Sequence, residues 1–157
     1  MEVPEARVLA LAGLLQAVQF VLVAVPANLE LGTAKTLSPR DPARFGRPLV
    51  EQVSPVTGRL FRALGNHFEG LVLFTLAVVA LALTGASNGF TLACAWVYLA
   101  ARVLYVPAYA LGLVPWRSLV WFVGWAATVA MMFVAAFSRE PPMAASDPFV
   151  IPAALHG

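Results

Sequence analysis

The fold of this chain is decided by the stretch Phe61-Arg62-Ala63-Leu64-Gly65-Asn66-His67-Phe68-Glu69-Gly70-Leu71. It carries an arginine, an asparagine and a glutamate directly into an apolar segment that continues through Leu83. On a helix, at about 100° per residue, Arg62, Asn66 and Glu69 fall within an arc of about 60°. A charge at the centre of a membrane helix costs about 2.5–3.5 kcal/mol, so these side chains must face protein, water or a ligand. The stripe is therefore either a functional site or a structural arrangement in which Arg62 reaches the interface and Glu69 pairs with a neighbouring arginine.

The composition is that of a membrane protein. Of the 157 residues, 61% are hydrophobic and only 11% are charged, whereas soluble domains have about 45–50% and about 25%. The length allows one integral membrane domain, residues 1–157, without a separate soluble one. The single cysteine, Cys94, excludes an intramolecular disulfide. The net charge of +2 does not indicate a nucleic-acid-binding patch.

Four apolar segments are each long enough to span about 30 Å of hydrocarbon. They predict an all-α bundle of four transmembrane helices, at about residues 8–27, 60–84, 90–111 and 116–137. We expect the first segment to be a retained helix rather than a signal peptide, because Glu2 and Glu5 precede it and it exceeds the usual length of about 7–15 residues. Between the first two helices we expect a long polar loop, residues 31–59, and after the last an irregular tail, residues 139–157.

A second polar stripe lies on the helix expected at 90–111. Tyr98, Arg102, Tyr105 and Tyr109 also fall within an arc of about 60°. Arg117 stands in the first turn of the helix expected at 116–137, where a cation opposes the helix dipole, so helix stability does not explain it.

The distribution of basic residues predicts the orientation in the membrane. They concentrate in the loop 31–59, and the positive-inside rule therefore places this loop and the turn at 112–115 in the cytoplasm, with both termini outside. In this layout Arg62, Arg102 and Arg117 approach the cytoplasmic face and can share one polar pocket.

The side chains of the predicted pocket suit an anionic, hydrogen-bonding small molecule. Guanidinium groups bind carboxylates with two parallel bonds, and a carboxylate such as Glu69 can bind an amine, so a zwitterionic peptide would satisfy the whole set. His67 points about 140° away from Arg62 on its helix. We therefore expect no metal site.

Several short motifs, in this order, resemble the MAPEG family, the membrane-associated proteins of eicosanoid and glutathione metabolism. The motifs are Arg62-Ala63, Asn66, Glu69, Ala101-Arg102-Val103, Tyr109 and Pro115-Trp116-Arg117-Ser118, and the similarity covers residues 8–137. Two further stretches look like the bacterial branch of the family, Pro26-Ala27-Asn28-Leu29 and Asn66-His67-Phe68-Glu69-Gly70.

The resemblance implies a four-helix subunit that assembles as a homotrimer, in the inner membrane of a bacterium, with glutathione bound between neighbouring subunits. By match of position, the residues that would hold glutathione are Arg62, Asn66, Glu69, Arg102 and Tyr109, with Tyr105 from the same stripe. Arg117 matches the arginine thought to stabilise the glutathione thiolate, which would make it the catalytic residue. A lipophilic co-substrate would enter sideways from the lipid bilayer.

The chain departs from the family pattern at some positions. Gly65 stands where several catalytic members have a basic residue, and Trp121 where some have tyrosine. Three functions stay open. The first is a glutathione-dependent transferase or peroxidase acting on lipophilic electrophiles, and the second a non-catalytic membrane protein that binds a lipid or a partner. The third, a small transporter, is disfavoured because the chain has no inverted repeat or broken half-helices.

Overall fold

The computed structural model describes residues 3–39 and 46–138, and this part of the chain is all-helical. Its long helices are α1 (Glu5–Leu31), α5 (Pro55–Thr84), α6 (Gly89–Ala110) and α7 (Trp116–Phe137). Each of the four is long and apolar enough to cross a membrane, so the protein is a multi-pass integral membrane protein, as the composition predicted. The tail expected at 139–157 lies outside the described residues.

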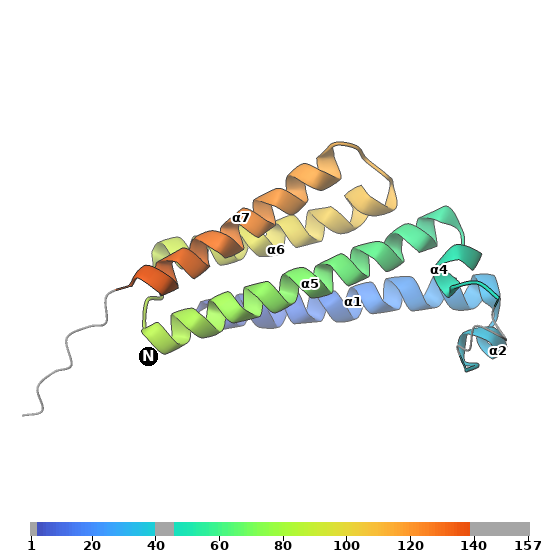
Figure 1. Ribbon diagram of the computed structural model, residues 1–157, viewed down its shortest axis with the longest axis horizontal. Helices are drawn as coiled ribbons and strands as arrows, with labels where there is room; N and C mark the ends of the chain where they lie inside the picture. The colour runs from blue at the N-terminus through green and yellow to red at the C-terminus, as the bar shows by residue number, and fades with distance from the viewer. Residues whose placement is uncertain (1–2, 40–45, 139–157) are drawn as a thin grey trace, which may run out of the picture.

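The four helices run antiparallel to their sequence neighbours in an elongated bundle (Figure 1). The N-terminus and the end of α7 lie at one end of the bundle, and the α6–α7 turn lies at the other. α1 packs mainly on α5 and α6, and α7 packs mainly on α6 and α5. The two helices that carry the polar stripes, α5 and α6, therefore form the centre of the bundle.

The loop expected at 31–59 is shorter than predicted, because regular structure extends into it from both sides. α1 continues through Leu31 and α5 begins at Pro55. Within the described residues between them, 32–39 and 46–54, lie the single-turn helices α2 (Thr33–Thr36) and α4 (Leu49–Gln52). The reason is helix capping. The Ser54 hydroxyl accepts from the Thr57 backbone N–H at 3.3 Å, and Pro55 occupies the first helical position, where a missing N–H does no harm.

A carboxylate ties the end of α1 to the start of α5. Glu30 accepts hydrogen bonds from the Ser54 backbone N–H at 2.5 Å and from the Thr57 hydroxyl at 2.6 Å. The α5 terminus therefore has both a hydroxyl cap and a nearby negative charge, which the helix dipole favours.

A second carboxylate, which unlike Glu30 is buried, joins α1 to the rest of the bundle at the opposite end. Glu5 is fully buried and accepts from the Ser87 hydroxyl at 2.7 Å and the Thr91 hydroxyl at 2.5 Å. α1 consequently begins at Glu5 rather than at the expected Val8, because this acidic residue is bonded inside the bundle.

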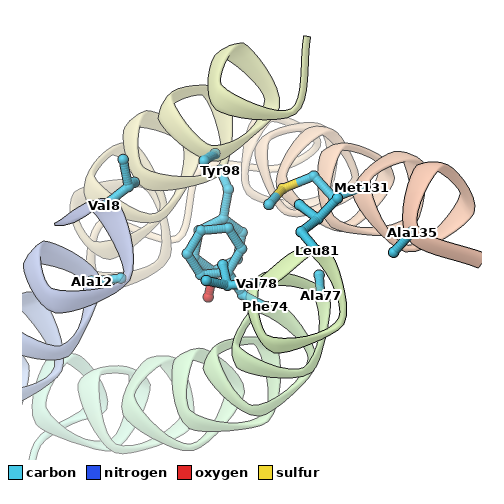
Figure 2. Packing of buried hydrophobic residues seen from close by; sticks show 10 residues of the cluster. Val8, Ala12, Phe74, Ala77, Val78, Leu81, Tyr98, Met131 and Ala135 are labelled. Carbon is cyan, nitrogen blue, oxygen red and sulfur yellow. The ribbon is translucent and has the colours of Figure 1, made fainter. Parts of the chain in front are cut away.

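The apolar core occupies the half of the bundle that contains the start of α1 and the end of α7. Phe74 stacks on Tyr98 with ring centroids 4.0 Å apart, and Figure 2 shows Val8, Ala12 and Met131 around this pair. α6 and α7 approach closely at Gly124, where a Cβ would lie 3.3 Å from that of Ala101. This close approach places the polar residues of α6 and α7 against one another farther along the bundle.

Candidate functional site

A cavity of about 460 Å³ lies between α5, α6 and α7, toward the α6–α7 turn. Its lining residues are Asn66 from α5, Tyr105 and Tyr109 from α6, and Arg117, Ser118, Trp121 and Phe122 from α7. This volume is within the range of about 300–1,000 Å³ that small-molecule sites occupy. Four of the predicted site residues, Asn66, Tyr105, Tyr109 and Arg117, thus share one cavity.

Arg117 is held against the cavity wall by an aromatic ring. Its guanidinium carbon lies 5.2 Å from the centroid of the Tyr109 ring, and the Tyr105 and Tyr109 rings are 5.3 Å apart. A cation over a tyrosine ring is attracted by the ring quadrupole. The α6–α7 turn, in which Gly112 adopts a left-handed conformation, brings Arg117 back to this ring. The Tyr109 ring therefore holds the half-buried Arg117 guanidinium at the wall of the cavity.

Arg102 lies deeper in the bundle, only 3% exposed. Its Nη1 donates to Asn66 Oδ1 at 3.2 Å, and its guanidinium carbon is 5.1 Å from the Tyr98 ring centroid. The side chain crosses α5 directly over Gly70, where a Cβ would lie 1.9 Å from Nη2. Glycine at position 70 is therefore required for this placement, and Asn66 links Arg102 to the cavity.

Arg62 and Glu69 stand apart from the cavity. Both side chains are exposed on the outer surface of α5, and neither lines the cavity. The three residues of the predicted stripe therefore do not share one environment, because Asn66 is partly buried whereas Arg62 and Glu69 are exposed. Asn66 faces α6, where it accepts from Arg102. Arg62 and Glu69 lie on the outer surface of the chain.

Three lining residues on α7 were not among the predicted site residues, namely Ser118, Trp121 and Phe122. Their signal is helical spacing, because positions three and four apart share a face and residue 121 follows Arg117 by four. The signal is weak in an apolar segment, where the same spacing also occurs on lipid-facing surfaces. Trp121 stacks on Trp125 with centroids 6.3 Å apart, which orients its ring along α7.

Comparison with known proteins gives one match. The model of one family, described as the MAPEG family, matches residues 8–137, which include all four long helices except a few terminal residues. No curated protein and no solved structure matches the chain.

Proposed function

Because the chain belongs to the MAPEG family, we propose that it is a glutathione-dependent transferase or peroxidase that acts on lipophilic electrophiles in the membrane. The observation that carries the proposal is the position of Arg117, whose guanidinium lines a small-molecule-sized cavity and is held over Tyr109 at 5.2 Å. Lipid binding alone does not require a cation at that point.

Glutathione offers two carboxylates, an amine and a thiol, and the polar residues at the site match these groups. Arg102 and Asn66 suit a carboxylate, because a guanidinium and an amide supply several N–H donors. Arg117 suits the sulfur. A thiol with a pKa of about 8.5 is mostly protonated at neutral pH, and a nearby cation favours the thiolate. Lowering the thiol pKa by one unit requires only about 1.4 kcal/mol of interaction.

Arg62 and Glu69 support assembly of the protein as a homotrimer. They are exposed on a membrane-spanning helix whose exposed neighbours include Val72 and Leu76, and charges facing hydrocarbon cost about 2.5–3.5 kcal/mol each. In a homotrimer that packs α5 against a neighbouring subunit, both charges leave the lipid and can contribute to a glutathione site at the interface. Small residues along the helices, such as Gly65, permit such close packing.

The lipophilic co-substrate would reach the site from the bilayer. Phe122 lines the cavity and is 56% exposed, so the cavity borders an exposed apolar surface of α7. In the proposed reaction this surface faces lipid. A hydrophobic electrophile can therefore approach the sulfur without crossing water.

Substitution of Arg117 tests the enzyme function on detergent-purified protein. We expect Arg117→Ala to keep glutathione affinity within a few-fold but to lower kcat by about 10²-fold or more, because the thiolate loses its counter-charge. Thiolate absorbance in the ultraviolet should appear when glutathione binds the native protein and fade in Arg117→Ala. Arg102→Ala should instead raise Kd and KM, since Arg102 is proposed to hold a carboxylate.

Arg7→Ala is the matched control, because Arg7 is an exposed arginine at the opposite end of the bundle. It should leave both parameters unchanged. If the native protein binds glutathione but never ionises it, the enzyme function fails.

A non-catalytic lipid-binding function is the second candidate, and one observation favours it. A trough of about 480 Å³ between α1 and α5 is lined mainly by apolar side chains, among them Phe20, Val23 and Phe61. Its two polar lining residues, Asn28 and Thr36, bond each other. Such a surface suits an acyl chain. Saturable binding of a fluorescent fatty acid, together with no glutathione binding, would favour this function.

A further inference from the structure

A layer of buried polar side chains crosses the middle of the bundle, behind the candidate site. Among the described residues, five buried side-chain atoms form no hydrogen bond of good geometry within the protein: Gln16 Oε1, Gln19 Oε1, His67 Nε2, Tyr98 Oη and Arg102 Nε. The Tyr98 hydroxyl and the Arg102 guanidinium are close enough to interact with each other, which leaves the two glutamine oxygens and His67 Nε2 without a protein partner. The five come from three helices, α1, α5 and α6. His67 and Tyr98 are fully buried, and Gln19 and Arg102 are each 3% exposed.

The contacts of these residues bring them together at one level. The Gln19 side-chain amide bonds His67 Nδ1 across the α1–α5 contact. Arg102 reaches α5 at Gly70, which is three residues and therefore about one turn from His67 on the same face. The Arg102 guanidinium therefore reaches α5 within one turn of His67.

The remaining two residues belong to the same level. Gln16 precedes Gln19 by three residues on α1, and α1 runs antiparallel to α5, so Gln16 lies beside the turn of α5 that contains Gly70. Tyr98 lies one turn before Arg102 on α6, with its ring 5.1 Å from the guanidinium carbon. Figure 2 shows the Tyr98 hydroxyl directed away from the α6 backbone, into the space between the helices.

The five atoms form a mixed set of donors and acceptors. A neutral His67 that accepts from Gln19 at Nδ1 carries its proton on Nε2, so Nε2 is a donor, as is Arg102 Nε. The two glutamine oxygens are acceptors, and the tyrosine hydroxyl can be either. If the Gln19 amide is turned over, its nitrogen becomes the free donor and Nε2 of His67 an acceptor, and the set is still mixed.

This mixture selects the ligand. A small anion would accept from the donors but would face the glutamine oxygens, which repel it. A metal cation would face Arg102. Water donates and accepts, and a buried water typically makes about three hydrogen bonds. Leaving the two glutamine oxygens and His67 Nε2 unbonded would cost about 1–3 kcal/mol for each atom, and hydrocarbon outside the helices offers no alternative partner.

We propose that Gln16, Gln19, His67, Tyr98 and Arg102 form an internal water-binding site at mid-bundle. About two water molecules suffice for the five atoms. The bound water connects the glutamines of α1 with the Nε face of Arg102, whose other edge bonds Asn66 in the candidate site. This inference does not depend on glutathione binding.

Radiolytic footprinting of the whole protein in detergent tests the proposal, because X-rays convert bound water into hydroxyl radicals that oxidise adjacent side chains. We expect oxidation of His67 and Tyr98 despite their burial. Met131 is the internal control, since it is equally buried in the apolar core and a thioether is more reactive than an imidazole. Because Tyr98 packs in the same cluster as Met131, the comparison is made for His67, which lies outside that cluster. Oxidation of His67 no higher than that of Met131 would overturn the proposal.

A substitution locates the water. Gln16→Leu should lower oxidation of His67 severalfold, because it removes an acceptor and fills part of the site. Gln52→Leu, the same change in α4 outside the bundle, should not alter it. Unchanged oxidation in a folded Gln16→Leu protein, or equal losses in both variants, would overturn the assignment. If glutathione never binds but the footprint appears, the water site stands while the proposed function fails.

Discussion

At the scale of single residues, Arg102 has the most demanding environment. A guanidinium is held inside a membrane bundle by a neutral amide and two aromatic rings, Tyr98 at 5.1 Å and Tyr105 at 6.0 Å. Cation–π attraction is strongest where the cation is desolvated. The arrangement also depends on a residue with no side chain, because the guanidinium occupies the space where a Cβ at position 70 would stand.

Gly70→Ala is therefore expected to displace Arg102 from Asn66. A guanidinium is the mobile end of a long side chain, so we expect the protein to fold, with the loss appearing in ligand binding. Glutathione affinity measured by calorimetry should fall about tenfold, which corresponds to about 1.4 kcal/mol, the size of one charge-assisted hydrogen bond.

Gly13→Ala, in α1, is the control for that change. Position 13 also lies inside a long helix, and a Cβ there meets nothing within 4 Å. Alanine should raise stability by up to about 1 kcal/mol through helix propensity alone and leave affinity unchanged. Equal affinities for the two variants would contradict the role of Gly70.

Glu5 offers a second prediction at this scale. Glu5→Ala leaves the Ser87 and Thr91 hydroxyls without their acceptor, and it should destabilise the protein by about 1–3 kcal/mol. Thermal unfolding in detergent measures the effect. Glu51→Ala, at an exposed glutamate of α4, should leave the midpoint unchanged, and a similar decrease in both variants would show that Glu5 acts only through charge.

At the scale of elements, the long helices could be predicted from apolar segments, but their ends could not. The apolar pattern from Leu60 onward predicts which part of the helix lies in the membrane. The helix itself begins earlier, at Pro55, because Ser54 caps it and Glu30 of α1 accepts a hydrogen bond from the Ser54 backbone. Likewise, helical spacing placed Arg62, Asn66 and Glu69 on one stripe. It could not show that the packing of α6 divides the stripe, so that Asn66 is partly buried while Arg62 and Glu69 are exposed, because spacing does not identify the neighbouring helix.

The α6–α7 turn is joined to α5 by a residue that the sequence analysis did not single out. Arg59 Nη1 donates to the Ala110 carbonyl at 3.3 Å, at the end of α6. A Cβ added at Gly112 would lie only 2.9 Å from Arg59 Nη1, so the guanidinium packs directly against this glycine. A cation at a helix C-terminus complements the helix dipole, so Arg59 is well placed to fix the turn that carries Arg117.

Arg59→Ala should therefore loosen this turn. The amides of Gly112 and Leu113 are bonded to the Tyr109 and Ala108 carbonyls, and we expect them to exchange hydrogen about tenfold faster, a local loss of about 1.4 kcal/mol. Mass-spectrometric hydrogen exchange measures it. Arg47→Ala, an exposed arginine before α4, should leave the turn unaffected. Protection that persists in Arg59→Ala would contradict the clamp.

At the scale of the whole molecule, the surface of the single chain carries two charged side chains on a membrane-spanning helix. The cavity brings Asn66, Tyr105, Tyr109 and Arg117 together within one chain, whereas Arg62 and Glu69 remain exposed. The sequence could predict which residues are polar and where along the helices they stand. It could not show which lie within one chain's cavity, because that division follows from the packing of α6 and α7 on α5. The orientation of the termini relative to the cytoplasm stays a prediction.

A homotrimer is expected to be the stable form in mild detergent. Native mass spectrometry should show three subunits, because Arg62 and Glu69 gain partners and leave the hydrocarbon in the assembly. Replacing both charged residues, Arg62→Leu with Glu69→Leu, should keep the chain membrane-inserted while weakening the trimer or changing its packing. A native protein that is only monomeric would contradict the assembly.

The exposed Phe122 at the edge of the cavity has a kinetic consequence for the proposed reaction. A co-substrate that arrives through the bilayer diffuses to the enzyme within the plane of the membrane. The concentration that sets the rate is therefore its mole fraction in the lipid, not its amount per volume of buffer. The test fuses proteoliposomes with vesicles that contain no substrate, while the bulk concentrations of protein, co-substrate and glutathione are held constant. The added lipid lowers the mole fraction of co-substrate in the membrane, and turnover should therefore slow. Diluting the same preparation with buffer leaves the mole fraction of co-substrate in the membrane unchanged. The turnover of each enzyme molecule would then change only because the glutathione concentration falls.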